Sequence, residues 1–137
     1  MIAIDTNVLL RYIVKDDAEQ ASVAVTFIEQ NHCVLLHTVL LETVWVLSSK
    51  HGYHLSKTLI VQELRDFIGL PNVFTQDDEV VAESLSLYEQ GMDFADILHF
   101  KTAANLQGFA TFDRRMRNKV KLLNLQQPLV FLGTESH

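Results

Sequence analysis

Short apolar runs and longer periodic segments alternate along this chain. The short runs at 1–4, 34–37, 72–75, 109–111 and 129–132 are typical of strands. Helical spacing of apolar residues predicts helices at 8–14, in a segment that closes near Asn31, from Thr38 to Gly52, from Ser56 to Ile68, and in two segments that end at Gly91 and Gly108. The stretch 119–128 has no clear pattern. Strands that alternate with helices predict an α/β fold with a largely parallel sheet.

The composition fits one compact globular domain. The chain has 137 residues, of which 48% are hydrophobic and 20% are charged, and we expect a single domain over 1–137 because no linker or repeat divides it. No segment has the roughly 18 consecutive apolar residues of a membrane helix, and the N-terminus lacks the basic region of a signal peptide. We therefore expect a cytoplasmic protein without membrane contact. The single cysteine, Cys33, is expected to be a small buried apolar residue.

The charge distribution leaves two explanations open. A net charge of −6 argues against a nucleic-acid partner at face value. Five of the eleven Lys and Arg residues, however, lie together at Arg114, Arg115, Arg117, Lys119 and Lys121. Such a run is usually a solvated face. A basic strip beside carboxylates would also suit an enzyme that acts on a polyphosphate backbone.

Two aspartates follow predicted strands directly. Asp5 comes after the first strand, and Asp113 comes after the strand that ends at Thr111. Ligands and catalytic groups collect at the carboxyl ends of parallel strands, so both are candidates for function. Asp5 taken alone is explained equally well as the cap of the helix that follows.

Three further acids lie on predicted helices. Glu42 is the only ionisable residue between Thr38 and Ser48, on a helix so apolar that we expect it to be buried. A buried carboxylate must be paired, hydrogen-bonded or bound to a metal, and a salt bridge to a distant Arg or Lys is the alternative to a functional role. Asp93 and Asp96 lie three residues apart at a helix start. Capping explains at least one of them, and Asp96 is the better ligand candidate because it lies inside the helix.

Acids from two strand ends and two helices predict a cluster of four carboxylates. Such a cluster would repel itself, and several members would stay protonated. A divalent cation removes this repulsion, and ligands that are all oxygen favour hard ions such as Mg²⁺ or Mn²⁺.

With these motifs in this order, the chain resembles the PIN-domain ribonucleases, and within them the VapC-type toxins of bacterial toxin–antitoxin pairs. The resemblance covers essentially the whole chain, with departures after Asp113. It implies a PIN-like three-layer sandwich whose central, mostly parallel sheet of four to five strands is flanked by helices. The motifs are Ile4-Asp5-Thr6-Asn7, Glu42, Asp93-Phe94-Ala95-Asp96 with Leu98-His99 and Ala103, and Thr111-Phe112-Asp113.

The resemblance also implies a function and its residues. The function is metal-dependent endonucleolytic hydrolysis of RNA with one or two Mg²⁺ or Mn²⁺ ions, in a homodimer that a cognate antitoxin neutralises. The acidic quartet of the family falls on Asp5, Glu42, Asp96 and Asp113, with Asp5, Asp96 and Asp113 as metal ligands and Asp93 as an auxiliary acid. The supporting residues would be Thr6, Asn7 and Thr111, and the possible RNA contacts Arg114 and Arg115.

Three alternatives remain beside this interpretation. A PIN-like module could have lost hydrolysis, and a nuclease could act on DNA, since nothing in the sequence reads a 2′-hydroxyl. A phosphatase of the haloacid dehalogenase type also begins with a strand that ends in Asp, but it requires a second Asp where Asn7 stands. The aromatic residue Trp45 is expected in the core or at its rim, and we expect packing roles for His37 and His99.

Overall fold

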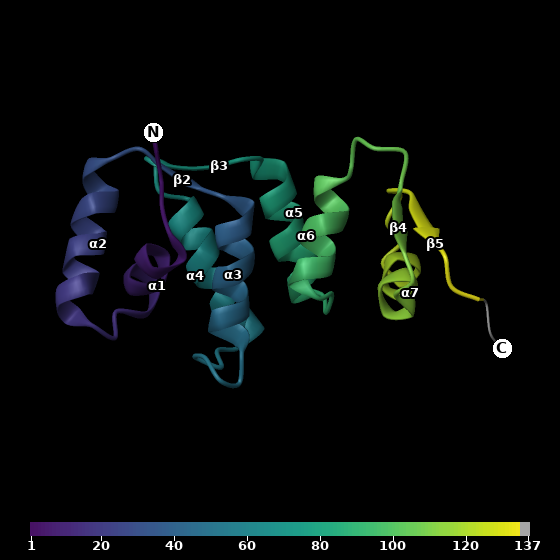
Figure 1. Cartoon of the computed structure of the whole chain (residues 1–137), viewed down its shortest axis with the longest axis horizontal. Helices are drawn as coiled ribbons and strands as arrows, with labels where there is room; N and C mark the ends of the chain where they lie inside the picture. The colour runs from purple at the N-terminus through teal and green to yellow at the C-terminus, as the bar shows by residue number, and fades with distance from the viewer. Residues whose placement is uncertain (135–137) are drawn as a thin grey trace. The chain divides into compact units, whose positions relative to one another are not determined.

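The computed structural model describes residues 1–134 of the chain (Figure 1). The backbone forms two compact units, Met1–Ala82 and Glu83–His137. The boundary between the units falls within one helix, α5 (Asp78–Glu89).

The first unit contains a parallel sheet of three strands in the order β1-β2-β3. In this sheet Ala3 pairs with Val34, and Leu35 pairs with Thr75. The elements are β1 (Ile2–Ala3), α1 (Thr6–Val14), α2 (Ala18–Gln30), β2 (Cys33–Leu35), α3 (His37–Ser48), α4 (Lys57–Ile68) and β3 (Val73–Thr75). Its core is built from fully buried side chains, among them Leu9, Ile28, Cys33, Leu35, Leu40, Leu47, Ile60, Leu64 and Phe67.

The second unit contains a pair of parallel strands, β4 (Phe109–Thr111) and β5 (Leu129–Phe131). Its helices after α5 are α6 (Phe94–Thr102) and α7 (Arg114–Leu122). Glu83 and Lys101 form an ion pair of 2.9 Å between α5 and α6. The buried side chains include Leu85, Phe94, Ile97, Leu98, Phe100 and Met116.

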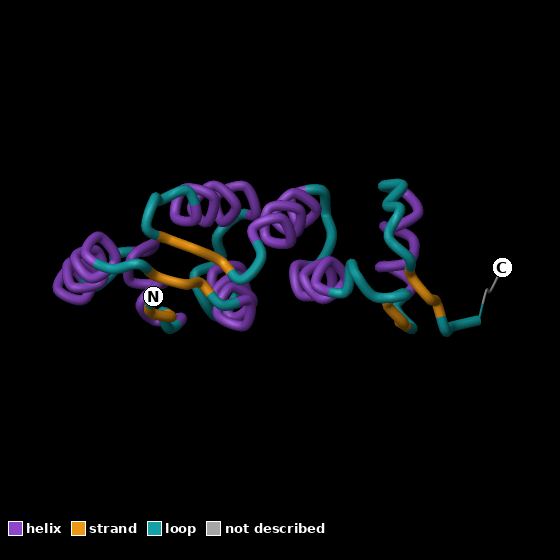
Figure 2. The backbone as a smooth tube through the Cα atoms, turned by 90° about the horizontal axis from the view of Figure 1, so that it is seen from above, coloured by secondary structure: helices purple, strands orange, loops and turns teal. Residues whose placement is uncertain are grey.

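The structure confirms the predicted α/β class with parallel strands, which Figure 2 shows in orange. The five predicted strands are all present. The strands of the first unit form a sheet of three, and those of the second unit form a sheet of two.

Capping contacts confirm two of the predicted helix starts. Asp17 accepts a hydrogen bond of 3.0 Å from the Gln20 amide at the start of α2, and Ser56 accepts one of 3.2 Å from the Leu59 amide at the start of α4. After α5, Gly91 adopts a φ of 102°, a left-handed conformation that Gly adopts without steric cost.

Three helices differ from the prediction. Helix α3 ends at Ser48 and does not continue to Gly52. Helix α6 ends at Thr102 and does not continue to Gly108, because no residue from 103 to 107 is buried and a helix without a buried face has little to stabilise it. Helix α7 was not predicted, since its many charges suggested a solvated run. Met116 and Val120, four residues apart, are its buried face.

Among residues 1–134, no helix combines the length and the apolar character that crossing a membrane requires.

Candidate functional site

Asp5 stands at the end of β1, where the backbone turns into α1. Its backbone is extended, and its carbonyl oxygen accepts hydrogen bonds of 3.1 Å from the Val8 amide and 3.2 Å from the Leu9 amide. The carboxylate itself makes no capping hydrogen bond with α1 and is exposed. Asp5 therefore begins the helix through its backbone only, and capping does not account for its side chain.

Thr6 connects this turn to the third helix. The side chain of Thr6 is buried, with 5% of its surface exposed, and its Oγ1 donates a hydrogen bond to Oε1 of Glu42. The hydroxyl group that follows Asp5 thus fixes one carboxylate oxygen of another predicted site residue. Asn7, in the same turn, is exposed.

Glu42 itself is exposed, which corrects the prediction that its helix is buried all round. The buried side chains of α3 are Leu40, Thr43, Val44 and Leu47. Thr38, Glu42 and Trp45 are all exposed. They share one face of the helix because they are four and three residues apart. Trp45 is 69% exposed, so the prediction that it packs in the core or at its rim was wrong.

In the second unit, two aspartates share the start of α6. Asp93 is the N-cap, and its Oδ1 accepts a hydrogen bond of 3.0 Å from the Asp96 amide. Asp96 is half-buried in the first turn, whereas His99 one turn later is exposed. Capping therefore explains Asp93, while the Asp96 carboxylate has no part in the cap of α6.

Asp113 follows β4 and is the N-cap of α7. Its Oδ1 accepts a hydrogen bond of 3.1 Å from the Met116 amide. The Oγ1 of Thr111 accepts a hydrogen bond of 3.0 Å from the Asp113 amide, which fixes the backbone before the carboxylate. Asp113 is exposed. Although its carboxylate caps α7, it therefore still has oxygen lone pairs that face solvent.

The three aspartates of the second unit influence one another. Burial raises the pKa of Asp96, and the negative charges of Asp93 and Asp113 raise this pKa further. A hydrogen bond between the side chains of Asp96 and Asp113 acts in the same direction, and His99 opposes these effects in part. The ionised form of Asp96 is therefore disfavoured when Asp93 and Asp113 are also ionised.

The donor chemistry fits a hard divalent cation, since every candidate ligand is a carboxylate and the negative charges of Asp93 and Asp113 disfavour ionisation of Asp96. Within residues 1–134, no three His, Cys, Asp or Glu side chains are arranged closely enough to hold a metal ion. The structure places Asp5 and Glu42 in the first unit and Asp93, Asp96 and Asp113 in the second.

The basic residues of α7 are partly used within the second unit. Arg114 donates a hydrogen bond of 2.5 Å to the Thr134 carbonyl, and the guanidinium of Arg117 lies 4.4 Å from the ring centre of Phe131. Both side chains hold the segment around β5. Arg115 is exposed on the same helix.

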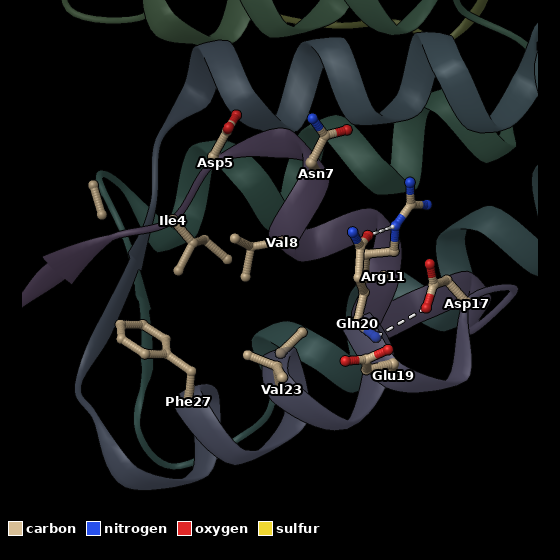
Figure 3. A pocket seen from close by; sticks show the side chains of 12 residues that line it. Ile4, Asp5, Asn7, Val8, Arg11, Asp17, Glu19, Gln20, Val23 and Phe27 are labelled. Carbon is tan, nitrogen blue, oxygen red and sulfur yellow. Dashed lines mark hydrogen bonds between the residues drawn. The ribbon is translucent and has the colours of Figure 1, made fainter.

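A groove lies between α1 and α2 in the first unit (Figure 3). It has a volume of about 690 Å³, and its lining includes Asp5 and Asn7. Its apolar wall consists of Ile4, Val8, Val23, Ala24 and Phe27, and its polar end of Arg11, Asp17, Glu19 and Gln20. The Nε of Arg11 donates a hydrogen bond of 2.6 Å to Oε1 of Gln20 and closes this polar end. Figure 3 shows Asp5 and Asn7 pointing away from Val23 and Phe27.

A model of the PIN domain family matches residues 2–122 of the chain. The chain belongs to the PIN domain family. The match includes all five candidate acids and ends at the last residue of α7, so β5 lies beyond it. Searches of curated proteins and of solved structures found no match.

Membership of the PIN family confirms the fold family that the sequence motifs predicted. PIN domains are typically metal-dependent nucleases, so the family indicates a nuclease-type function with a nucleic-acid substrate and divalent metal ions. The sequence analysis did not reveal that Trp45 is exposed beside Glu42. The signal was present in the spacing of 42 and 45, which puts both residues on one face of the helix.

Proposed function

We propose that this PIN domain is an endoribonuclease that hydrolyses RNA phosphodiester bonds with one or two Mg²⁺ or Mn²⁺ ions. The observation that supports this most directly is the grouping of three carboxylates in the second unit. There the side chains of Asp96 and Asp113 share a hydrogen bond, and burial, followed by the negative charges of Asp93 and Asp113, raises the pKa of Asp96. Carboxylates that repel one another destabilise the fold in the absence of a cation, so their proximity favours a role in which a cation binds them.

The carboxylates have different tasks in this proposal. By resemblance to the family, Asp5, Asp96 and Asp113 would be the metal ligands, and Asp93 would support Asp96 through the capping of α6. Glu42, oriented by Thr6, positions the attacking water in line with the scissile phosphate. The bound metal would lower the pKa of that water and neutralise the charge that develops on the phosphate. Thr111 keeps Asp113 in place through its backbone.

RNA is the proposed substrate because the chain resembles PIN ribonucleases, and exposed basic side chains of α7 would bind its backbone. Arg115 is the better candidate for this contact. Arg114 also belongs to the proposal, although its hydrogen bonds to Thr134 hold it within the unit. Phosphate contacts of this type give affinity without sequence selection.

The test compares the wild-type chain with Asp5→Asn for cleavage of cellular RNA and of single-stranded DNA in Mg²⁺, Mn²⁺ or EDTA. We expect RNA cleavage by the wild type with either metal, none in EDTA, and a loss of at least about a hundredfold in Asp5→Asn. Asp66→Asn changes the same charge on an exposed position of α4 and should leave the rate unchanged. Equal activity under all conditions, or none under any, contradicts the proposal, and cleavage of DNA alone supports the alternative substrate.

We also propose that the chain is the toxin of a toxin–antitoxin pair and that the groove between α1 and α2 receives a segment of the antitoxin. The apolar wall suits an apolar helix face, while Asp17 and Glu19 at the rim favour a partner with cationic side chains. A small reading frame beside the gene would supply the partner for the test. Val23→Glu places a charge on the exposed wall and should abolish binding of that protein, whereas Thr26→Glu, on an exposed position of the same helix, should not.

The proposed homodimer rests on apolar surface of the first unit, such as Leu59 of α4, which is 39% exposed. Sedimentation equilibrium measures the mass of the particle directly. A mass of one chain at all concentrations would contradict the dimer without affecting the nuclease proposal.

A further inference from the structure

A cluster of polar side chains joins three segments of the first unit at the last turn of α1. There the Nη1 of Arg11 donates a hydrogen bond of 3.2 Å to Oδ1 of Asp16. The hydroxyl group of Tyr53 donates one of 3.0 Å to Oδ2 of Asp16 and lies 3.5 Å from the Nη1 of Arg11. The Nε of Arg11 also donates to Gln20 of α2 (Figure 3). Arg11, Asp16 and Tyr53 therefore form a clamp, the Tyr53 clamp, between α1 and the loop that follows α3.

The loop that carries Tyr53 folds back on the end of α3. The Tyr53 amide donates a hydrogen bond of 3.2 Å to the Val46 carbonyl, and the Leu55 amide donates one of 2.8 Å to the Leu47 carbonyl. A Cβ atom at Gly52 would lie 2.1 Å from the Val46 carbonyl oxygen, so the loop approaches the helix at a distance that only glycine permits. These backbone contacts fix the position of the Tyr53 hydroxyl group relative to α3.

Polar contacts thus connect α1 and α3 at two points. Near the start of α1, Thr6 donates a hydrogen bond to Glu42 of α3, and near its end the Tyr53 clamp holds Arg11. The two contact residues of α1 are five positions apart, which corresponds to about 7.5 Å along the helix axis. A helix held at one point can pivot about it, whereas a helix held at two points has a fixed direction. Because Asp5 directly precedes Thr6, the direction of α1 also determines where Asp5 stands relative to Glu42.

The Tyr53 clamp is expected to affect geometry more than stability. The side chains of Arg11 and Asp16 are 28% and 47% exposed, and ion pairs with this exposure contribute little to the free energy of folding. Reaction rates are far more sensitive to position, since a displacement of about 1 Å caused by a remote substitution can lower a rate about a hundredfold.

We propose that Tyr53 is a positioning residue for the site of Asp5 and Glu42. Through Asp16 and Arg11, its hydroxyl group sets the direction of α1 along α3. The inference rests on the proposed function, because it takes Asp5 and Glu42 to act in cleavage. It adds that a hydroxyl group outside the candidate acids and their hydrogen-bond partners controls the rate.

Kinetics of Tyr53→Phe, which removes only the hydroxyl group, test the effect on the rate. We expect kcat for RNA cleavage to fall about threefold to tenfold and KM to stay within about twofold, because the substitution changes the placement of reacting groups and no contact with the strand. Tyr12→Phe is the matched control. It removes a hydroxyl group from α1, keeps the ring that packs against Phe67, and should leave both constants unchanged. The temperature of unfolding should change by less than about 5 °C in either variant.

Two double variants distinguish positioning from a general loss of stability. Asp16→Ala removes the acceptor and should lower kcat about as much as Tyr53→Phe, and the two together should lower it no further, because they break the same contact. Tyr53→Phe combined with Thr6→Val removes both connections between α1 and α3. It should lower kcat by more than the product of the two single effects, while the changes in unfolding free energy should simply add.

A second measurement does not depend on cleavage. In protein labelled with ¹³C at the glutamate carboxyl groups and kept in EDTA, the Glu42 resonance is assigned by its loss in Glu42→Gln. We expect Tyr53→Phe to move this resonance in the same direction as Thr6→Val, because a displaced α1 weakens the hydrogen bond from Thr6. Tyr12→Phe should leave the resonance in place.

The outcomes separate this inference from the proposed function. An unchanged Glu42 resonance in Tyr53→Phe would overturn the inference in any case, and so would equal effects of Tyr53→Phe and Tyr12→Phe. In an active enzyme, an unchanged kcat in Tyr53→Phe would overturn it as well and would leave the nuclease proposal intact. A resonance that moves as expected in a chain that cleaves no RNA with metal would support the alignment of α1 by Tyr53 and contradict the nuclease proposal.

Discussion

The hydroxyl group of Thr6 donates a hydrogen bond to Oε1 of Glu42. This contact joins residues 36 positions apart and connects the first turn of α1 to α3. Because Thr6 is buried and directly follows Asp5, the turn that sets the backbone of Asp5 also sets the orientation of the Glu42 carboxylate. The two candidate acids of the first unit are thus held by one local structure.

Replacing Thr6 by Val keeps the branched shape and removes the hydroxyl group. We expect the rate of RNA cleavage to fall about tenfold or more, because Glu42 loses a hydrogen bond to a charged acceptor and with it a fixed orientation. The free energy of unfolding should change by no more than about 1 kcal/mol, since water can solvate the exposed carboxylate. Single-turnover rates and urea denaturation measure the two quantities.

Two matched variants separate function from packing in that experiment. Thr6→Ser keeps the donor and should retain most of the activity. Thr43→Val removes a hydroxyl on the buried face of α3, where it donates to the Val39 carbonyl at 2.7 Å, and it should leave cleavage unchanged. If Thr43→Val and Thr6→Val lower the rate equally, the orientation of Glu42 is not the cause.

The raised pKa of Asp96 predicts how stability depends on pH. The folded chain binds this proton more tightly than the unfolded chain, so the stabilisation is complete below the ordinary pKa of 3.8 and is lost as the pH rises through the raised value. At pH 7 in EDTA, Asp96→Asn should therefore unfold at a temperature about 1 to 3 °C higher than the wild type. Below about pH 3.8 the difference should disappear.

Thermal unfolding followed by circular dichroism across this pH range measures the effect, with Asp66→Asn as the control. A wild type that is more stable than Asp96→Asn at neutral pH in EDTA would contradict the repulsion between the aspartates. Addition of Mg²⁺ should stabilise the wild type more than the variant, because only the wild type offers the full set of carboxylates.

The capping contacts predict that Asp113 and Asp5 respond differently to the same substitutions. Asp113→Ala loses the hydrogen bond to the Met116 amide and should destabilise the chain by about 1 kcal/mol, whereas Asp113→Asn can still cap the helix and should cost much less. Asp5→Ala and Asp5→Asn should be about equally stable, because the Asp5 side chain makes no cap. All four variants should lose cleavage activity.

Chemical denaturation of the four proteins gives the comparison. A similar loss of stability in Asp113→Ala and Asp113→Asn would show that the cap at α7 contributes little. A large difference between Asp5→Ala and Asp5→Asn would mean that the Asp5 carboxylate is used as a cap after all.

Arg114 and Arg115 are neighbours in sequence, but different effects are expected from their replacement by Ala. Arg115→Ala should weaken RNA binding about equally for all sequences and reduce its salt dependence, as expected for loss of one phosphate contact. Arg114→Ala should instead lower stability, because its hydrogen bonds to Thr134 are lost. Filter binding at several salt concentrations measures the effect on RNA affinity, and thermal unfolding measures the effect on stability. If Arg114→Ala weakened RNA binding and Arg115→Ala lowered stability, the roles proposed for the two residues would be reversed.

Sequence periodicity predicted most elements, because strands and helices with a clear apolar face are encoded locally. It failed for α7, where a buried face made of only Met116 and Val120 is outnumbered by charges. It failed for the end of α6, where the last turns bury nothing. In both cases the apolar face that stabilises a helix is small or missing. Whether the helix forms, and where it ends, then depends on packing against the rest of the unit.

The candidate site was predictable to a different degree for each acid. The position of Asp5 after a strand was visible in the sequence, and the structure excluded the capping of α1 by its carboxylate. The exposure of Glu42 was mispredicted because the apolar composition of the helix hid the spacing of Thr38, Glu42 and Trp45. The raised pKa of Asp96 results first from burial, then from Asp93 and from Asp113, which lies 17 positions later, so the local spacing of Asp93 and Asp96 shows only part of it.

The burial of Cys33 makes the rate of thiol labelling a measure of how often the first unit opens. This thiol, the only one in the sequence, is fully buried in the middle strand of the three-stranded sheet, and burial raises its pKa. A thiol reagent can attack it only when the sheet of the first unit opens, because the reactive thiolate requires contact with solvent. The rate of labelling therefore measures the opening of the first unit alone, and a ligand that closes around Asp5 and Glu42 should slow it.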